Sequence, residues 1–409
     1  MSVPVEALYR FPWSKTDNPG AWVEVTDECD LDCPGCYRHR LEGHRPLDEL
    51  KRDILALRKA LNCERIAIAG GEPLLYPQIV EVVDFIARQG MKPMILTNGK
   101  KLTPELLSEL KKAGLKLFYF HVDSGQQRPG WEGKTEAEMN GLRQKFADLL
   151  WEAGGLQCGY NITVFPSTLS SIPDILSWAR ANIHKVQHVS LISFRSILLQ
   201  DGWTYEVNGC PIDTTRFHCA TANPDDLDVS VEKMAEVVGE VFPDIRPCAF
   251  LNGTTSPETY KFLIYLVLGT KKRIYGCLGA KTAELVQVFY HFAKGHYLSF
   301  QDKAMLGKKV FLLGLIDREA RKSWSRFRRS LFREPRGAFE KIYVQCINLQ
   351  QPNETLNGKT NLCDGCLNMM FYHGQLIHSC QLDEYRLFGG PIQPGRPNKK
   401  DESRPQEGL

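Results

Sequence analysis

The feature that most constrains the fold is a regular alternation of short β-rich runs and amphipathic helical patterns between residue 21 and about residue 195. Runs rich in apolar and β-branched residues predict strands at six places, namely 21–25, 65–69, 92–97, 115–122, 156–165 and 188–193. The stretches between them predict helices, among them 47–61, 76–90 and 103–114. The last begins with Thr103-Pro104-Glu105 and ends at Gly114, as the preferences for helix ends require.

Strands and helices that alternate at this spacing predict right-handed βαβ units and a parallel sheet. Six strands are fewer than the eight of a closed barrel. We therefore expect an α/β fold with a partial (β/α)6 barrel, open on one side, over residues 21–200. In such barrels the active site is built from loops that follow the C-terminal ends of the strands, so the residues after each predicted strand are candidates for chemistry.

The alternation ends near residue 200, and the rest of the chain divides by composition. A short N-terminal segment, 1–20, precedes the barrel, and a mostly helical middle region is expected over 201–335. Helical patterns there cover 230–242, 256–269 and 280–295, and the apolar stretch 256–316 suggests a substrate pocket or lid. A small cysteine-rich region, 336–390, follows. The polar, proline-rich tail, 391–409, is expected to be disordered.

Composition and charge narrow the function classes. A formal net charge of +3 on 409 residues argues against bulk nucleic-acid binding, so no nucleic-acid partner is expected. The first twenty residues contain no apolar segment typical of a signal peptide, and no apolar run approaches the roughly 20 residues that span a bilayer. Thirteen cysteines in such a chain are expected to be thiols or metal ligands. The expected location is the cytoplasm, with at most a peripheral contact to a membrane.

Three of the cysteines, Cys29, Cys33 and Cys36, lie together in the loop after the first predicted strand. Three is an unusual number, because structural zinc takes four ligands and disulfides need an even count. Three thiolates can hold three irons of a cubane [4Fe–4S] cluster and leave the fourth iron for another molecule. Spacing alone leaves two alternatives, a zinc ion with a distant fourth ligand and a chance cluster of inert thiols.

This spacing, followed by the aromatic Tyr37, resembles the CxxxCxxCΦ signature of the radical S-adenosylmethionine (SAM) superfamily. The resemblance implies that SAM chelates the fourth iron and that Tyr37 helps to hold its adenine. One electron, from a donor such as flavodoxin or ferredoxin, then cleaves SAM to methionine and a 5′-deoxyadenosyl radical, which abstracts hydrogen from a substrate C–H bond. The protein in such a reaction orients the reactants and excludes side reactions.

Short motifs after the later strands occur in the order typical of the family. The segment AGGEPLL (69–75) resembles the GGEP motif, whose backbone and Glu72 receive the SAM ammonium group. Each motif has a structural alternative, such as a tight turn for GGEP or a helix cap for Asp123. The resemblance assigns these residues to SAM: Tyr37, Gly70, Gly71, Glu72, Pro73, Thr97, Asn98, Asp123, Ser124, Asn161, Thr163 and Leu191, with Ile192 as the alternative to Leu191.

A second cysteine set lies in the C-terminal region, with the spacing Cys363-x2-Cys366-x13-Cys380 and Cys346 upstream. Four thiolates can hold either a second [4Fe–4S] cluster or a structural zinc ion, and the spacing does not decide between them. The resemblance favours the cluster, because radical SAM enzymes with a twitch or SPASM extension carry an auxiliary [4Fe–4S] cluster after the barrel.

The remaining features allow more than one interpretation. Scattered buried thiols are the simplest interpretation of Cys210, Cys219, Cys248 and Cys277, which lack a recognisable spacing. The basic stretch 317–334 is either a solvated helix face or an amphipathic helix that meets a phosphate or an anionic lipid surface. The apolar stretch 256–316 favours a lipid-like substrate. The rival to an enzyme is a non-catalytic iron–sulfur or zinc protein that acts as a binding module.

Overall fold

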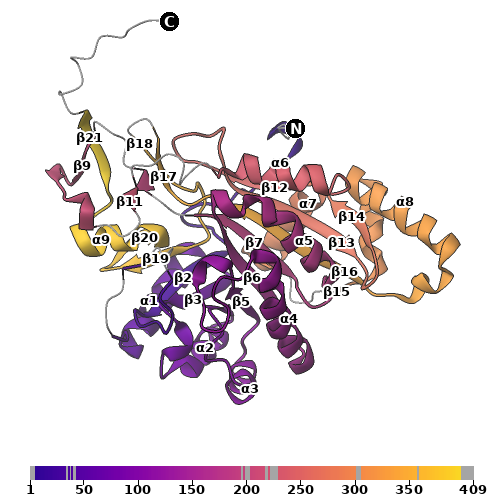
Figure 1. Ribbon diagram of the computed structural model, residues 1–409, viewed down its shortest axis with the longest axis horizontal. Helices are drawn as coiled ribbons and strands as arrows, with labels where there is room; N and C mark the ends of the chain where they lie inside the picture. Colours follow the sequence, from indigo (N-terminus) through magenta and orange to yellow (C-terminus); the bar gives the residue numbers. More distant parts are fainter. Residues whose placement is uncertain are drawn as a thin grey trace, which may run out of the picture.

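The fold is known from a computed structural model, which describes residues 5–33, 36, 38–39, 43–194, 197–198, 203–216, 220–221, 229–300, 305–356 and 359–397. Its centre is a 12-stranded sheet whose main path runs β1-β12-β13-β16-β7-β6-β5-β4-β3-β2 (Figure 1). Residues 398–409 of the predicted tail lie outside the described residues, whereas Gln393–Pro397 form strand β21, which pairs antiparallel with β9 (Trp203–Val207), so the prediction of disorder is wrong for this part of the tail.

Strands β2 to β7 run parallel and in chain order along one half of this sheet. They are β2 (Gly20–Thr26), β3 (Arg65–Gly70), β4 (Lys92–Thr97), β5 (Leu117–His121), β6 (Gln157–Val164) and β7 (His188–Ser193). The helices between them are α1 (Leu47–Leu61), α2 (Ile79–Arg88), α3 (Pro104–Lys112), α4 (Glu136–Ala153) and α5 (Ile172–Ala181). This confirms the predicted α/β fold with a partial (β/α)6 barrel.

Two-residue alternation divides the side chains of these strands between two cores. Residues such as Ile66 and Ile68 of β3 pack outward into the core that also contains Ile54 and Leu57 of α1. The inward residues of the same strands form a separate core with the C-terminal region. The outer core packs the helices against the sheet. The inner core packs the C-terminal region against the open side of the barrel.

The sheet continues past β7 with strands from the second half of the chain. Strand β16 (Ile342–Gln350) pairs parallel with β7, β13 (Tyr260–Gly269) pairs antiparallel with β16, and β12 (Ala249–Asn252) pairs antiparallel with β13. The helix predicted over 256–269 is therefore wrong, because β13 occupies most of it. Nearly all of β13 is buried, and such a strand shows a continuous apolar run that periodicity cannot distinguish from a buried helix.

The middle region is therefore mixed rather than mostly helical. Three predicted helices are confirmed there, as α6 (Val231–Val241), α7 (Ala280–Lys294) and α8 (Arg318–Arg333). The apolar side chains of β13 and β14 (Ile274–Leu278), however, belong to the central sheet and its cores. This part of 256–316 is thus structural rather than a lid. Among the described residues, no helix has both the length and the apolar character needed to cross a membrane.

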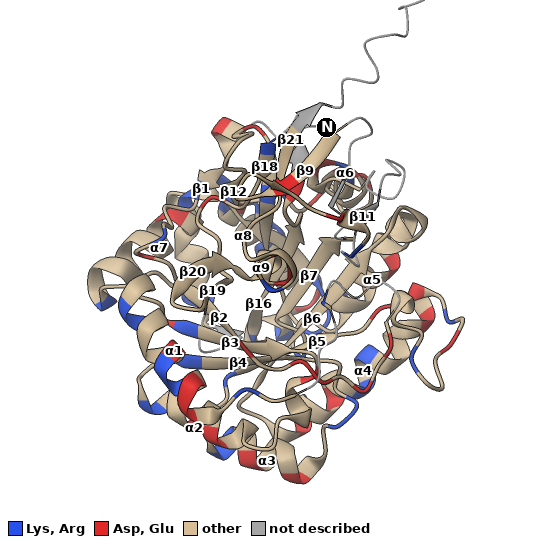
Figure 2. Ribbon diagram, turned by 90° about the vertical axis from the view of Figure 1, so that its left-hand side faces the viewer, with Lys and Arg blue, Asp and Glu red and all other residues tan. Residues whose placement is uncertain are grey.

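The C-terminal region closes the inner side of the barrel. It contains the hairpin of β19 (Met369–Tyr372) and β20 (Gln375–His378) and the short helix α9 (Leu382–Phe388), beside β2 at the edge of the sheet (Figures 1 and 2). The core shared by the two parts is formed by Trp22, Ala67, Ala69, Met94, Leu117, Phe300, Met370, Ile377 and Leu382. The cysteine-rich extension is therefore packed against the barrel.

Candidate functional site

The cysteine loop after β2 is held to the turn after β3 by main-chain hydrogen bonds. Gly71 N donates to the carbonyl of Thr26 at 2.8 Å, and Glu72 N donates to the carbonyl of Glu28 at 2.7 Å. A Cβ on Gly71 would lie 2.2 Å from the Glu28 oxygen, and Gly70 has a φ of 136° that favours glycine. The two glycines are needed because the main chains touch, and this contact brings Glu72 beside the first cysteine.

The three thiols of this loop lie close enough to influence one another. Cys29, Cys33 and Cys36 are each half-buried, and none forms a disulfide. Burial raises the pKa of Cys33 to about 12, and the charges of Cys36 and Cys29 add to the shift. Burial also raises the pKa of Cys29, with Glu72, Asp30 and Cys36 adding to it. Three neighbouring thiols on one loop form a donor set that suits an iron–sulfur cluster, which would bind them as thiolates.

The described side chains do not form a ready-made site for a single ion. Among them, no three or more His, Cys, Asp and Glu residues converge as ligands of one metal ion. The ligands of a cubane bind different irons, so they need not converge on one point. Tyr37, the aromatic residue of the predicted signature, lies outside the described residues.

Glu72 joins the turn after β3 to the turn after β4. Its carboxylate is fully buried and accepts hydrogen bonds from Leu74 N at 2.9 Å, Thr97 Oγ1 at 2.5 Å and Asn98 N at 2.7 Å. Burial raises the pKa of Glu72 to about 7, although these three hydrogen bonds act against it. Pro73 is buried and begins the short helix η2 (Pro73–Leu75). Glu72 therefore caps η2. Its Oε2 accepts one hydrogen bond, from Asn98 N, and keeps a second lone pair for a ligand.

Asn98 connects the turn after β4 to the cysteine loop. Its Nδ2 donates to Asp30 Oδ1 at 2.8 Å, and Lys100 Nζ donates to the Asp30 carbonyl at 3.0 Å. Asp30 follows Cys29 directly in the chain. Thr97 and Asn98, two of the residues assigned to SAM, therefore also support the position of the thiols.

A buried arginine that was not predicted lies between the thiols and the ends of β4 and β5. Arg128 donates to the carbonyls of Asn98 at 2.5 Å and His121 at 2.7 Å, and it is almost fully buried. Its positive charge opposes the rise in the pKa of Cys33, although burial and the neighbouring thiols outweigh it. The signal in the sequence was weak, because one arginine in a loop has no diagnostic spacing.

The ends of β5 and β6 meet at Asp123. Its Oδ2 accepts from Thr163 N at 3.0 Å and lies 2.7 Å from His121 Nε2, which is also 3.1 Å from Thr163 Oγ1. Burial alone would raise the pKa of Asp123, but His121 and the hydrogen bonds from Thr163 hold it below its usual value. Ser124 N donates to Glu136 Oε1 at 2.6 Å. The structure thus brings Asp123 and Thr163 together at the ends of β5 and β6.

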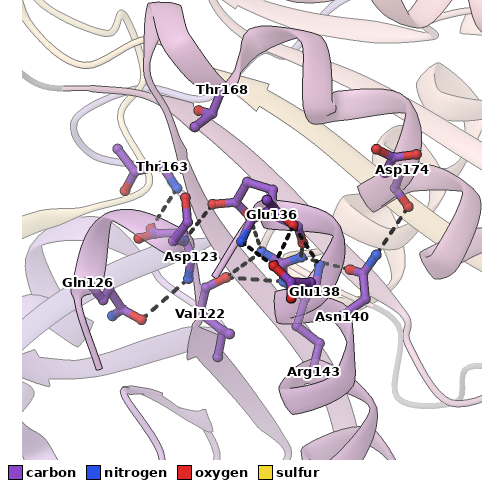
Figure 3. A network of polar contacts seen from close by, with 12 residues as sticks. Val122, Asp123, Gln126, Glu136, Glu138, Asn140, Arg143, Thr163, Thr168 and Asp174 are labelled. Carbon is purple, nitrogen blue, oxygen red and sulfur yellow. Dashed lines mark hydrogen bonds and ion pairs between the residues drawn. The ribbon is translucent and has the colours of Figure 1, made fainter. Parts of the chain in front are cut away.

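A buried ion pair supports this end of β5 from behind (Figure 3). Arg143 is fully buried, pairs with Glu136, and donates from Nε at 3.1 Å and Nη2 at 2.8 Å to the carbonyl of Val122. Glu136 in turn accepts from Ser124, so the pair joins helix α4 to both sides of Asp123. The network fixes the loop that carries Asp123 and Ser124.

A row of polar residues crosses four neighbouring strands on the inner face. The strand register pairs His121 with Asn161, Asn161 with Ser190, and Ser190 with Asn348. Asn348 Nδ2 lies 3.5 Å from Ser190 Oγ, while its buried Oδ1 has no hydrogen-bond partner among the described residues. Asn348 comes from β16, a strand that was not predicted, so it was missed.

The structure corrects one residue assigned to SAM. Leu191 is fully buried in the outer core between the sheet and the helices, so it does not reach the inner face. Its neighbour Ile192 is half-buried and is paired with Thr163 and Gln350 in the strand register. Two-residue alternation therefore leaves Ile192 as the apolar candidate on β7.

The structure brings together three of the four cysteines of the second set, Cys363, Cys366 and Cys380. Cys363 and Cys366 are buried in hydrogen-bond contact, and this contact, burial and the charge of Cys380 raise the pKa of Cys363 well above its usual value. Contact with Cys363, and then with His378, lowers the pKa of Cys366. His378 was not predicted as part of this set. Its buried Nδ1 has no hydrogen-bond partner among the described residues, and it lines a cavity with Cys363 and Cys366.

Cys346, the predicted fourth member, lies elsewhere. It is on β16 in register with His188 of β7, and burial alone raises its pKa to about 12. Cys363 bridges Gly253, next to the Asn252–Tyr260 pair of β12 and β13, whereas Cys346 pairs with Leu266, six residues further along β13. The structure therefore groups Cys363, Cys366 and Cys380 and leaves Cys346 apart from them.

The two cysteine sets are joined through buried charges. Arg38, just beyond the cysteine loop, pairs with Glu24 and donates to the carbonyl of Ser379 at 2.9 Å. His39 N donates to Asp383 Oδ2 at 2.7 Å. Because Ser379 precedes Cys380, these contacts hold the C-terminal set against the loop that carries the first set.

The other cysteines are dispersed. Cys248 and Cys277 are buried, as expected for core thiols, whereas Cys210 is exposed on β10 (Cys210–Pro211). Cys219 lies outside the described residues.

Comparison with known proteins identifies a family for part of the chain. Residues 23–179 match the family model described as the Radical SAM superfamily. Among curated relatives, the tungsten-containing aldehyde ferredoxin oxidoreductase cofactor-modifying protein of Pyrococcus furiosus is 31% identical over 106 residues, which are 25% of this chain and 30% of that protein. The PqqA peptide cyclase of Gluconobacter oxydans is 28% identical over 166 residues, 39% of this chain and 45% of that protein. The chain thus spans less than half the length of these two relatives.

Two solved structures show a partial likeness. Streptococcus suis SuiB bound to S-adenosylmethionine has a TM-score of 0.38 and 17% identity, over 55% of this chain and 47% of that chain. Native anSMEcpe with bound AdoMet and Cp18Cys peptide has a TM-score of 0.38 and 13% identity, over 55% and 58% of the two chains.

Proposed function

Because the chain belongs to the radical SAM superfamily through residues 23–179, we propose that its cysteine loop holds a [4Fe–4S] cluster at which SAM is cleaved. When bound, the cluster and SAM would supply a 5′-deoxyadenosyl radical that abstracts hydrogen from a substrate C–H bond. The observation that carries the proposal is the group of three neighbouring thiols, Cys29, Cys33 and Cys36, held against the Gly71–Glu72 turn. An electron donor such as flavodoxin or ferredoxin is part of the proposal.

The residues around the thiols have separate tasks in this proposal. Glu72, placed by the Gly70–Gly71 turn, offers one carboxylate lone pair to the SAM ammonium group. Asp123 and Thr163, on the ends of β5 and β6, offer acceptors to the ribose. Arg128 supplies a buried positive charge beside Cys33, which suits the negative charge of a thiolate-bound cluster.

We propose that the auxiliary site is held by Cys363, Cys366 and Cys380, with His378 beside them and Cys346 outside the set. The observations behind this are the contact of His378 with Cys366 and the placement of Cys346 on the inner face of β16. We propose a [4Fe–4S] cluster rather than zinc because radical SAM enzymes with a twitch or SPASM extension, which this chain resembles, carry an auxiliary [4Fe–4S] cluster after the barrel.

For the substrate we propose a polar molecule. The lipid-like substrate suggested by residues 256–316 loses its support, because β13 and β14 lie in the core. The polar row from His121 to Asn348 offers hydrogen bonds to a substrate that crosses β6, β7 and β16. The named relatives act on different molecules, so no single substrate follows from them.

The test is anaerobic reconstitution with iron and sulfide, followed by reduction in the presence of SAM. The proposed enzyme should bind about eight irons per chain, as two cubane clusters require, and should form 5′-deoxyadenosine and methionine. A protein that takes up zinc instead of iron, or that leaves SAM intact, would instead support a non-catalytic binding module.

The composition of the auxiliary site leads to a separate prediction. Cys366→Ala should lower the iron content from about eight to about four per chain, because one cluster loses a ligand, while SAM cleavage is retained in part. Cys346→Ala, the matched control on β16, should keep about eight irons. Iron analysis and electron paramagnetic resonance of the reduced proteins measure both. If Cys346→Ala lost as much iron as Cys366→Ala, the proposed ligand set would be wrong.

A further inference from the structure

One end of the molecule carries a basic surface that the proposed reaction does not use. Helix α8 lies at the opposite end of the long axis from α9 (Figure 1). It packs on β14 through one side, where Ser323 Oγ donates to the Cys277 carbonyl at 3.0 Å. The side chains buried there are Ala320, Ser323, Phe327 and Ser330. Residues on the opposite side of the helix face solvent.

Positive charge dominates this exposed side. The exposed basic side chains between residues 307 and 340, all of which the structure describes, are Lys308, Lys309, Arg318, Arg321, Lys322, Arg328, Arg329, Arg333 and Arg336. In the same range Glu334 is the one exposed carboxylate, and the half-buried Glu319 pairs with Lys322 at 2.7 Å. A local excess of this size attracts anionic partners even though the whole chain is nearly neutral.

Large apolar side chains lie exposed in the same segment. Phe332 is 86% exposed, Phe339 89% and Leu315 78%, and Leu312 and Ile316 are exposed as well. Arg321 donates to the carbonyls of Gly314 at 2.8 Å and Leu315 at 3.0 Å, so Leu315 lies next to the solvent side of α8. Apolar side chains grouped in this way commonly mark an interaction site.

We propose that the α8 surface, defined as the exposed side chains of residues 307–339, binds peripherally to an anionic phospholipid bilayer. The arginines would meet lipid phosphates, while the phenylalanine and leucine side chains would enter the boundary between headgroups and acyl chains. RNA would use the positive charge but leave most of these apolar side chains in water. The combination of both features therefore favours the bilayer.

The test is sedimentation of the full-length protein with vesicles of phosphatidylcholine, with and without phosphatidylglycerol. Binding should require the anionic lipid and weaken at high salt. Arg328→Gln with Arg329→Gln should lower the partition coefficient about twenty-five-fold, because each cation near an anionic surface contributes about fivefold. Phe332→Ala with Phe339→Ala should lower it at least tenfold.

The matched control is Phe292→Ala on α7, which removes an 88% exposed phenylalanine outside the α8 surface and should bind within about twofold of the unaltered protein. Circular dichroism of each variant checks that the fold is retained. Equal binding to both kinds of vesicle, or no binding to either, would overturn the proposal. So would unchanged binding of the double phenylalanine variant, or tighter binding to an RNA oligonucleotide than to anionic vesicles.

Discussion

The Cys33→Ala protein is expected to form no 5′-deoxyadenosine above background when it is reduced with SAM, and to bind about four irons instead of about eight. Cys33 is the middle member of the three neighbouring thiols, and its side chain is influenced by both of the others. Removal of one of three ligands leaves a second iron without a protein ligand, so the cluster is lost rather than weakened. Chromatography of the reaction products and iron analysis measure the two effects.

The control for this variant is Cys210→Ala. Cys210 is exposed on β10 and has no place in either proposed cluster site, so both the iron content and SAM cleavage should match the unaltered protein. Conversion of SAM by the Cys33→Ala protein at a rate near that of the control would contradict the proposed reaction site. If the Cys33→Ala protein lost only the signals of the auxiliary cluster, the two cysteine sets would have been assigned to the wrong clusters.

Glu136→Ala is expected to lower the free energy of unfolding by about 3–5 kcal/mol. The change leaves the guanidinium of Arg143 fully buried without its partner (Figure 3). An uncompensated charge in the interior costs far more than the ion pair contributes, because the lost attraction cannot be replaced by water. Urea unfolding followed by circular dichroism measures the change.

Two variants separate this effect from the general cost of altering α4. Glu138→Ala removes a carboxylate of the same helix that is exposed and pairs with Lys134, so its effect should be much smaller. Glu136→Leu combined with Arg143→Met removes both charges and should recover much of the lost stability. A Glu136→Ala protein as stable as Glu138→Ala would show that the pair does not support the fold.

The local pattern of the chain was sufficient for the barrel and for the position of its cysteine loop. Strands β2 to β7 alternate with helices whose ends carry residues such as Thr103 and Pro104, and each of these signals acts within a few residues. The C-terminal ends of parallel strands lie at one edge of the sheet. For this reason, residues as far apart as Cys29, Glu72 and Asp123 could be expected near one another from their positions after strands alone.

Other features of the fold and the site depend on contacts between distant segments, which no local sequence pattern records. Strand β13 is buried in the sheet, so it lacks the alternation that would have distinguished it from a helix. Strand β16 inserts beside β7 and thereby brings Asn348 to Ser190, 158 residues away in the chain. The sequence by itself determined a three-thiol loop at the end of a barrel strand. The buried Arg128, the contact of His378 with Cys366 and the separation of Cys346 depend on contacts between distant segments, and only the packed chain specifies those.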